Sequence, residues 1–217
     1  MVSLQTSAPG KLLLIGEYAV LDGASALVMA VDRRVRVAIS AARTGSGRLD
    51  APQLGIRRAR MAVENGALLC PGRSQAVPGL TARMVPAILH ELGQDPAVIA
   101  NLDLEIDSGA LFETGRDGPV KLGLGSSAAV SAALALGLEA WFGSGRVDVD
   151  PALLLRRWLP VYRDALGGVA SGADLAAAFY GGFNQFRISG DRAECRAVAW
   201  PAGLYWRAVW VGHAAQT

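Results

Sequence analysis

The sequence predicts an α/β fold of the two-layer α+β kind, in which a sheet packs against helices. Short apolar or alternating runs rich in Val, Leu and Ile fill the N-terminal third, separated by Gly and Asp, as is typical of strands. A long Ala- and Leu-rich segment, Ala128 to Trp141, has strong helix propensity. With 217 residues, of which 52% are hydrophobic and 18% charged, the chain can bury a core and is too apolar for disorder.

The N-terminal third of the chain is expected to be mostly sheet, followed by two helices and a strand. The segments Arg57 to Leu69 and Leu80 to Leu92 show helical spacing of apolar residues, and each is bounded by Gly or Pro. Leu102 to Ile106 alternates like a strand. The strands predicted in the N-terminal third are Leu12 to Ile15, Ala26 to Val31 and Arg34 to Ser40.

The second half is expected to hold three helices and then sheet. After the Ala-rich helix, Asp150 precedes Pro151, an N-cap residue before a proline in the first turn, and predicts a helix that reaches about Leu166. A third helix is predicted over Asp174 to Tyr180. The predicted final strands are Phe183 to Ile188, Glu194 to Ala199 and Trp206 to Val211.

Composition excludes several classes of partner. The net charge is +2, and the arginines are spread along the chain without a basic run, so no nucleic-acid surface is predicted. The longest apolar runs are interrupted by Gly or Arg before they reach membrane-spanning length. The first ten residues show no targeting pattern, and we therefore expect the cytoplasm. Cys70 and Cys195 have no metal-ligand spacing, and no zinc site is predicted.

A Gly-Ser loop runs directly into the Ala-rich helix, in the stretch Lys121 to Ala129 (KLGLGSSAA). Glycines let the backbone approach a polyanion, and the free N–H groups at a helix start bind phosphate. The hydroxyls of Ser126 and Ser127 add ligands for phosphate or magnesium. The loop lacks the spacing of a P-loop. An isolated loop of this kind is more often only a helix cap.

A Pro-Gly turn delivers a lysine to the start of a strand in the stretch Ser7 to Lys11 (SAPGK), and Gly16 to Leu21 (GEYAVL) follows that strand. From there the ammonium of Lys11 can reach a cleft and pair with an anion. Lys11 and Lys121 are the only lysines in the sequence, and both lie in Gly-rich stretches. Taken alone, a lysine in this setting is more often an ordinary surface residue at the start of a strand.

A carboxylate lies at the start of the third helix, in the stretch Ala170 to Asp174 (ASGAD) that precedes the pair Gly181 and Gly182. An aspartate at a helix start is most often a cap. A functional carboxylate at Asp174 would instead take a proton from a substrate hydroxyl or orient it.

These three stretches, in this order and separation, resemble the GHMP kinase family. The resemblance covers nearly the whole chain and implies the N-terminal domain of that family, with a ribosomal-protein-like βαβ sheet packed with helices. The nucleotide would lie between the Gly-Ser loop and the N-terminal sheet. Tyr18 favours the members that act on phosphomevalonate, because members that act on mevalonate usually carry His in this motif.

The resemblance assigns roles to matching residues. Lys11 and Asp174 would be the catalytic pair, and Ser127 would bind magnesium. The substrate would contact Lys11 and four further residues: Glu17, Tyr18, Ser171 and Gly172. The phosphates of ATP would be held by the loop and the helix start: Lys121, Gly123, Leu124, Gly125, Ser126, Ser127 and Ala128.

The implied function is a small-molecule kinase of isoprenoid precursor synthesis in the mevalonate pathway, which uses ATP and Mg²⁺ to convert phosphomevalonate into diphosphomevalonate. The alternatives are a mevalonate kinase and a non-catalytic nucleotide-binding module. The expected partners are ATP and the small acceptor, without nucleic acid or membrane, and a homodimer stays open.

Two departures from the family pattern leave the activity of this chain open. No third Gly-rich motif occurs before Thr217, so we expect an ATP-binding domain over residues 1–182 and, over residues 183–217, strands leading into a truncated C-terminal domain. Where relatives often place Glu or His near the metal, this chain has Tyr162, Arg163 and Asp164. Magnesium binding would then be weak or shift to Asp164.

Overall fold

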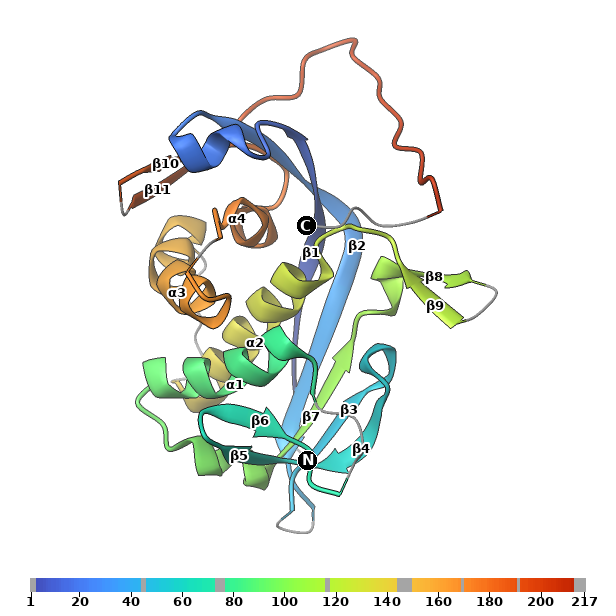
Figure 1. The fold of residues 1–217 in the computed structure, drawn as a ribbon, viewed down its shortest axis with the longest axis vertical. Helices are drawn as coiled ribbons and strands as arrows, with labels where there is room; N and C mark the ends of the chain where they lie inside the picture. The colour runs from blue at the N-terminus through green and yellow to red at the C-terminus, as the bar shows by residue number, and fades with distance from the viewer. Residues whose placement is uncertain are drawn as a thin grey trace.

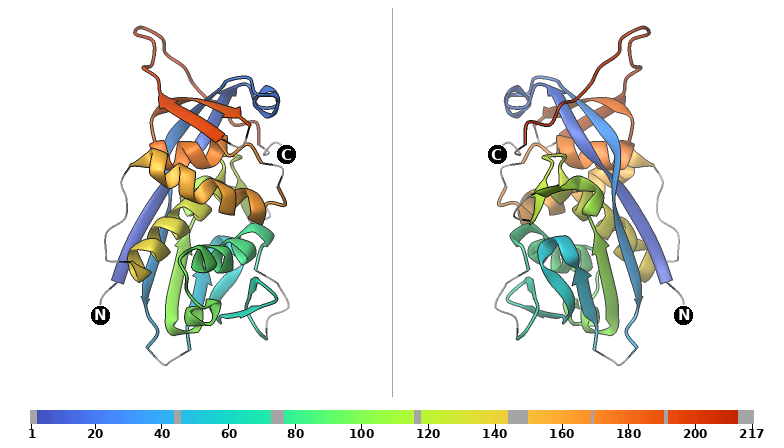
Figure 2. Two further views of the ribbon diagram at one scale, coloured as in Figure 1. Left: turned by 90° about the vertical axis from the view of Figure 1, so that its left-hand side faces the viewer. Right: turned by 90° about the vertical axis from the view of Figure 1, so that its right-hand side faces the viewer.

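The computed structural model describes residues 3–43, 46–72, 77–115, 118–143, 150–168, 170–190 and 192–212. A seven-stranded sheet forms one layer, and helices cover one of its faces, so the predicted α/β fold class is confirmed (Figures 1 and 2). In the part of the chain described, no helix combines the length and apolarity needed to cross a membrane.

The sheet is built around two long paired strands, β1 (Ser3–Ile15) and β2 (Ala26–Ala41). The strand order is β11-β10-β2-β7-β3-β4, with β1 paired to β2 off this path. All of these pairings are antiparallel except that of β3 with β7. The remaining bounds in this sheet are β3 (Arg48–Ala51), β4 (Ile56–Arg60), β7 (Leu102–Asp107), β10 (Phe183–Ser189) and β11 (Arg192–Ala197).

Four α-helices and two small hairpins complete the described elements. The helices are α1 (Gly79–Glu91), α2 (Ser126–Phe142), α3 (Pro151–Ala165) and α4 (Ala173–Tyr180). The hairpins are β5 (Ala62–Glu64) with β6 (Ala67–Leu69), and β8 (Phe112–Gly115) with β9 (Gly118–Lys121). Short 3₁₀ turns cover Ala19–Asp22, Pro52–Leu54, Pro96–Asn101 and Gly109–Leu111.

Helix α2 is the central helix of the helical layer. It packs on β1 and β2 and also contacts α1 and α4, while α3 contacts α1 and α4 (Figure 1). Ala129, Ala132 and Ala133 are fully buried, and the hydroxyl of Thr6 on β1 donates to the carbonyl of Ala133 at 2.8 Å. The small side chains therefore serve close packing of the helix against the sheet.

Most predicted elements are confirmed, and the helical ones match to within about two residues, as is usual for helix ends. The carboxylate of Asp150 accepts a hydrogen bond from the N–H of Ala152 at 2.8 Å, which confirms the predicted cap of α3. The two predicted strands Ala26 to Val31 and Arg34 to Ser40 form the single strand β2.

The predicted helix Arg57 to Leu69 is wrong. This segment forms β4 and the β5–β6 hairpin. Asn65 and Gly66, both with positive φ, make the hairpin turn, and Asn-Gly is a strong signal for a two-residue turn. Strand pairing therefore overrides the apolar spacing that suggested a helix.

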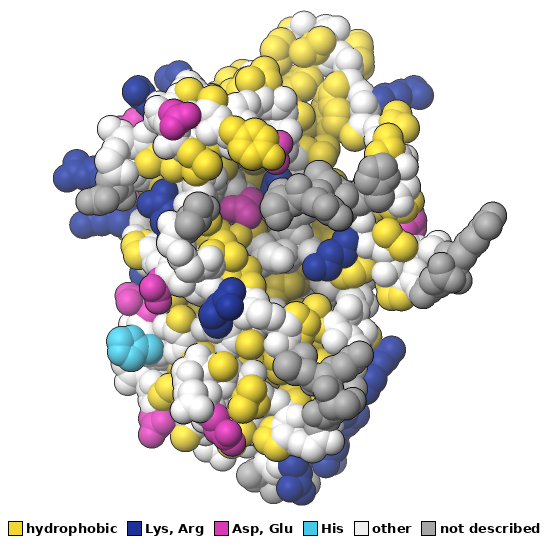
Figure 3. All heavy atoms as spheres, in the orientation of Figure 1, with side chains coloured by type: hydrophobic (Ala, Val, Ile, Leu, Met, Phe, Trp, Pro, Cys, Tyr) yellow, Lys and Arg dark blue, Asp and Glu magenta, His cyan; other side chains and the backbone are white. Residues whose placement is uncertain are grey.

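The predicted strand Trp206 to Val211 is also wrong, because this described segment pairs with no described strand and has no regular structure. Its apolar side chains lie on the surface, and Figure 3 shows apolar atoms gathered along this end of the molecule.

The predicted boundary between residues 182 and 183 stays a prediction, and β10 lies in the same sheet as β2. Residues 191 and 213–217 lie outside the described part of the chain.

Candidate active site

The three stretches singled out in the sequence meet at one open cleft of about 460 Å³. Strand β1 contributes one wall, the Gly-Ser loop and the start of α2 a second, and the start of α4 a third. Residues 163 positions apart in the sequence, Lys11 and Asp174, thus line the same cleft. The full set is Lys11, Leu12, Leu13, Glu17, Lys121, Gly123, Gly125, Ser126, Ser127 and Asp174.

Lys11 is held in place through its own backbone. Its N–H donates to the carbonyl of Leu124 at 2.8 Å, which joins β1 to the Gly-Ser loop. Just before Lys11 the pairing of β1 with β2 shifts, since Pro9 lies opposite Arg34 but Gly10 opposite Val31. Such a shift bends a strand locally and redirects its side chains. The side chain of Lys11 lies against Gly125, so the lysine is in direct contact with the loop.

Gly125 connects the loop to α2. It is the N-cap residue, in the left-handed conformation with φ 70° and ψ 38°, and no side chain caps this helix end. The first hydrogen bond of the helix runs from the N–H of Ala129 to the carbonyl of Gly125 at 3.1 Å. The N–H groups of Ser126, Ser127 and Ala128 precede it and have no partner within the helix. Together with the positive end of the helix dipole, they form an anion-binding end beside Lys11.

Asp174 occupies the first turn of α4 and is oriented from two sides. One carboxylate oxygen, Oδ2, accepts a hydrogen bond from the hydroxyl of Tyr162 on α3 at 2.8 Å. The other, Oδ1, accepts from the N–H of Leu175 at 2.9 Å. Tyr162 is 2% exposed. Burial, followed by the charge and hydrogen bond of Asp174, raises the pKa of Tyr162 well above its usual value, so its hydroxyl stays a donor.

The loop that leads into α4 is held by the same turn of α3. Arg163 donates from Nε to the carbonyl of Ala170 and from Nη2 to that of Ser171, both at 2.9 Å. The hydroxyl of Ser171 accepts from the N–H of Ala173 at 3.3 Å. Gly172 is buried against Leu159. Ser171 and Gly172 therefore shape the start of α4 and are not among the residues that line the cleft.

Five other predicted site residues divide between the cleft lining and its surroundings. Glu17 and Lys121 line the cleft. Tyr18 is 73% exposed and lies outside the cleft lining, at the start of the 3₁₀ turn that follows β1. Leu124 takes part through its carbonyl, and the side chain of Ala128 is buried in the core. Sequence reasoning gave Tyr162 no role toward Asp174, because the two residues lie on different helices and no local signal in the sequence joins them.

The residues present fit magnesium bound with a nucleotide better than magnesium alone. The cleft offers the carboxylates of Asp174 and Glu17 and the hydroxyl of Ser127, and the described residues contain no cluster of three or more His, Cys, Asp or Glu able to hold a metal. Magnesium commonly uses one or two protein oxygens and completes its shell with phosphate oxygens and water. Ser127 would thus share the ion with ATP.

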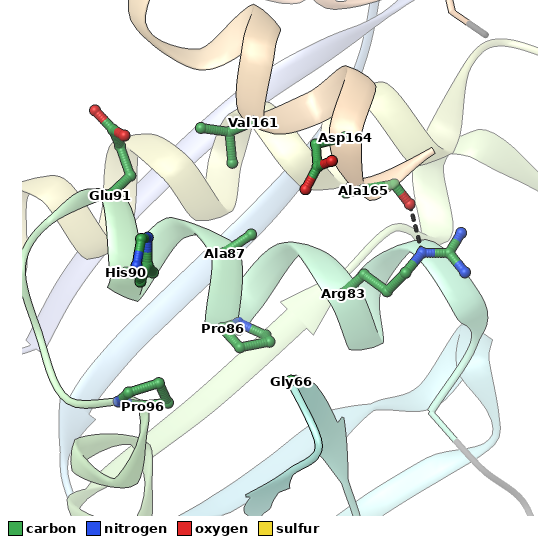
Figure 4. Close-up of a pocket in the computed structure, with 10 residues that line it drawn as sticks. All are labelled: Gly66, Arg83, Pro86, Ala87, His90, Glu91, Pro96, Val161, Asp164 and Ala165. Carbon is green, nitrogen blue, oxygen red and sulfur yellow. Dashed lines mark hydrogen bonds between the residues drawn. The ribbon is translucent and has the colours of Figure 1, made fainter. Parts of the chain in front are cut away.

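Asp164 faces a different part of the molecule. It lines a groove between α1 and α3 with Arg83, His90 and Glu91, and is not among the residues that line the cleft (Figure 4). Positions two apart on a helix face different directions, so Tyr162 reaches Asp174 while Asp164 points into this groove. The structure does not support the suggested transfer of magnesium binding to Asp164.

Comparison with known proteins shows similarity to one family of kinases. Residues 80–182 match the family described as GHMP kinases N terminal domain. The chain is 34% identical to a phosphomevalonate kinase of Streptomyces sp. (strain CL190), over 95% of this chain and 55% of that protein. Residues 80–182 therefore carry the sequence pattern of a GHMP kinase N-terminal domain. It is also 32% identical to a mevalonate kinase of Methanothermobacter thermautotrophicus, over 81% of this chain and 48% of that protein.

Solved structures of other proteins show the same fold. The phosphomevalonate kinase of Streptococcus pneumoniae in complex with phosphomevalonate and AMPPNP aligns with a TM-score of 0.59 at 22% identity, over 86% of this chain and 50% of that one. A Lin0012 protein from Listeria innocua aligns with a TM-score of 0.66 at 19% identity, over 93% and 59%. The chain spans about half the length of the curated relatives it matches.

Proposed function

We propose that the cleft binds Mg²⁺-ATP and that the chain carries the catalytic pair of a kinase that phosphorylates phosphomevalonate. The observation that carries the proposal is the meeting of Lys11, Asp174 and the uncapped start of α2 at one cleft. Phosphoryl transfer needs little covalent chemistry from the protein, and catalysis depends on positioning and charge stabilisation. These are the properties that the three walls supply.

Each wall has a task in this mechanism. The N–H groups at the start of α2 and the hydroxyls of Ser126 and Ser127 hold the phosphates of ATP. Lys11 lies beside the loop and balances the negative charge that develops during transfer. Asp174 orients the acceptor oxygen and takes the proton of an acceptor that bears one. Magnesium bound with ATP would neutralise further charge on the phosphates.

Phosphomevalonate is the acceptor we favour. The relative with 34% identity is a phosphomevalonate kinase, and the sequence carries Tyr18 in the Gly-Glu-Tyr motif. The second proton of a phosphate monoester is lost near pH 6, so the acceptor arrives mostly as a dianion. The ammonium groups of Lys11 and Lys121 in the cleft suit such an acceptor. Mevalonate kinase is the second candidate, because mevalonate kinases are also among the relatives.

The test is mass spectrometry of the products after incubation of the chain with Mg²⁺-ATP and one acceptor at a time. The acceptors are phosphomevalonate, mevalonate, homoserine and galactose, and Asp174→Asn is the control. We expect diphosphomevalonate with the wild type only. Phosphorylation of mevalonate instead would establish the second candidate. ATP binding without any product would identify the chain as a nucleotide-binding module and refute the proposed activity.

A further inference from the structure

A tyrosine inside the helical layer makes direct contact with the carboxylate of the cleft. Tyr162 lies in the last turns of α3, and its ring is packed in the core with 2% exposure. Its hydroxyl donates to Oδ2 of Asp174 at 2.8 Å. Tyr162 does not line the cleft, so it contacts the carboxylate from behind.

The contact fixes the orientation of Asp174. An aspartate side chain has two rotatable bonds, and a hydrogen bond to each oxygen restrains both. Oδ1 is held locally by the N–H of Leu175, and Oδ2 is held across the helical layer by Tyr162. The neighbouring Arg163 fixes the backbone of the preceding loop at Ala170 and Ser171. One turn of α3 therefore sets both the backbone and the side chain at the start of α4.

We propose that Tyr162 is a positioning residue for phosphoryl transfer, whose hydroxyl holds the carboxylate of Asp174 in the direction of the cleft. This inference rests on the proposed function, in which Asp174 acts on the acceptor. Tyr162 itself touches neither nucleotide nor acceptor, because its side chain lies behind Asp174 in the core.

The physical properties of the hydroxyl suit this task. A buried tyrosine that faces a carboxylate remains neutral, since burial and the negative charge both oppose loss of its proton. It therefore acts as a donor throughout the pH range in which a kinase works. Phenylalanine keeps the ring and its packing but has no donor, so Oδ2 would lose this restraint and turn toward water in the cleft.

The experiment compares Tyr162→Phe with Tyr180→Phe in the 217-residue chain. Tyr180 ends α4, is half-buried, and is absent from the residues that line the cleft, so its variant controls for loss of a tyrosine hydroxyl near the same helix. For Tyr162→Phe we expect kcat to fall by roughly 10- to 100-fold, the range for one hydrogen bond to a charged group. The KM for ATP should change by less than about threefold, and Tyr180→Phe should match the wild type.

Crystal structures of the two variants give a second measurement that is independent of turnover. In Tyr162→Phe we expect the carboxylate of Asp174 in a new rotamer or in several, with the loop at residues 170–172 unchanged. An unchanged Asp174 in that variant, or an unchanged kcat in an active protein, would overturn the inference. A wild type that phosphorylates none of the acceptors refutes the proposed function instead, and the rotamer of Asp174 then still decides whether Tyr162 positions it.

Discussion

Gly125 allows the sharpest test of the cleft, because a single added methyl group acts on Lys11. In Gly125→Ala, the new Cβ would lie 2.8 Å from Cγ of Lys11 and 3.2 Å from its Cε. The lysine side chain must move to relieve this contact. Gly125 also has a φ of 70°, and an L-residue in the left-handed conformation costs about 1–2 kcal/mol.

The expected magnitudes follow from these two effects. The free energy of unfolding should fall by about 1–2 kcal/mol, from the backbone conformation alone. A displaced Lys11 loses a charge-assisted contact to phosphate of about 1.5–3 kcal/mol, which weakens Mg²⁺-ATP binding by roughly 10- to 150-fold. Gly93→Ala is the matched control, since Gly93 has a φ of 67° and nothing within 4 Å of its added Cβ.

The assay combines urea unfolding with calorimetric titration of Mg²⁺-ATP. Both variants should lose similar stability, and only Gly125→Ala should lose affinity. If Gly125→Ala binds Mg²⁺-ATP as tightly as Gly93→Ala does, then Lys11 does not act on the phosphates from this position, and the assignment of the cleft to ATP is refuted.

Three further predictions concern α3 and α4. Asp174→Asn should lower kcat by at least about 100-fold while calorimetry shows near-normal ATP affinity. If the variant loses both folding and ATP binding, Asp174 serves as a helix cap and has no catalytic role. Gly172→Ala would place its Cβ 2.1 Å from Cδ1 of Leu159 and should lower the free energy of unfolding, measured with urea, by more than about 2 kcal/mol. The same change should cost less stability in a protein that also carries Leu159→Ala. If the stability losses of the two changes simply add, the two side chains do not clash. The folded state keeps the proton of Tyr162, whereas the unfolded chain releases it near the usual pKa of 10.0. The free energy of unfolding should therefore decrease as pH rises above 10, by up to about 1.4 kcal/mol per pH unit from this group. In Tyr162→Phe the decrease between about pH 9 and pH 11 should be shallower. Equal slopes for the two proteins would show that Tyr162 does not keep its proton in the folded state.

The sequence predicted the helices where a local signal and the tertiary environment agree. Asp150 and Pro151 mark the start of α3, and the carboxylate of Asp150 makes the expected capping bond. The small residues of α2 have high helix propensity and also fit against β1 and β2. Local and tertiary preferences coincide at these elements, which is the condition under which local patterns are reliable.

The two wrong elements show where local pattern and environment differ. Between Arg57 and Leu69 the apolar residues fit a helical period, but Asn65 and Gly66 form a turn and β4 pairs with β3. Between Trp206 and Val211 the alternation fits a strand, yet no described strand lies alongside it. A strand requires a partner for its backbone groups, and a period in the sequence does not supply one.

The residues that line the cleft could largely be predicted from the sequence, but the contacts that hold them in place could not. The Gly-Ser loop, Lys11 and Asp174 each carry a local signal, and the structure brings them to one cleft. The family resemblance assigns Ser171 and Gly172 to the substrate, whereas in the structure they form the turn that leads into α4 and do not line the cleft. The contact of Tyr162 depends on how α3 packs on α4, which no short motif encodes.

The position of β10 beside β2 has a consequence for the order of folding. Residues 183–186 pair with residues 26–29, and Asp174 reaches the cleft of Lys11 only when α4 has docked on β1 and β2. Contacts between residues so distant in sequence form late and slow the folding of a domain. During synthesis, one side of β2 stays unpaired at residues 26–29 until the ribosome has released β10. Phosphoryl transfer by a nascent chain is therefore expected to appear only after α4 has docked and β10 has paired with β2.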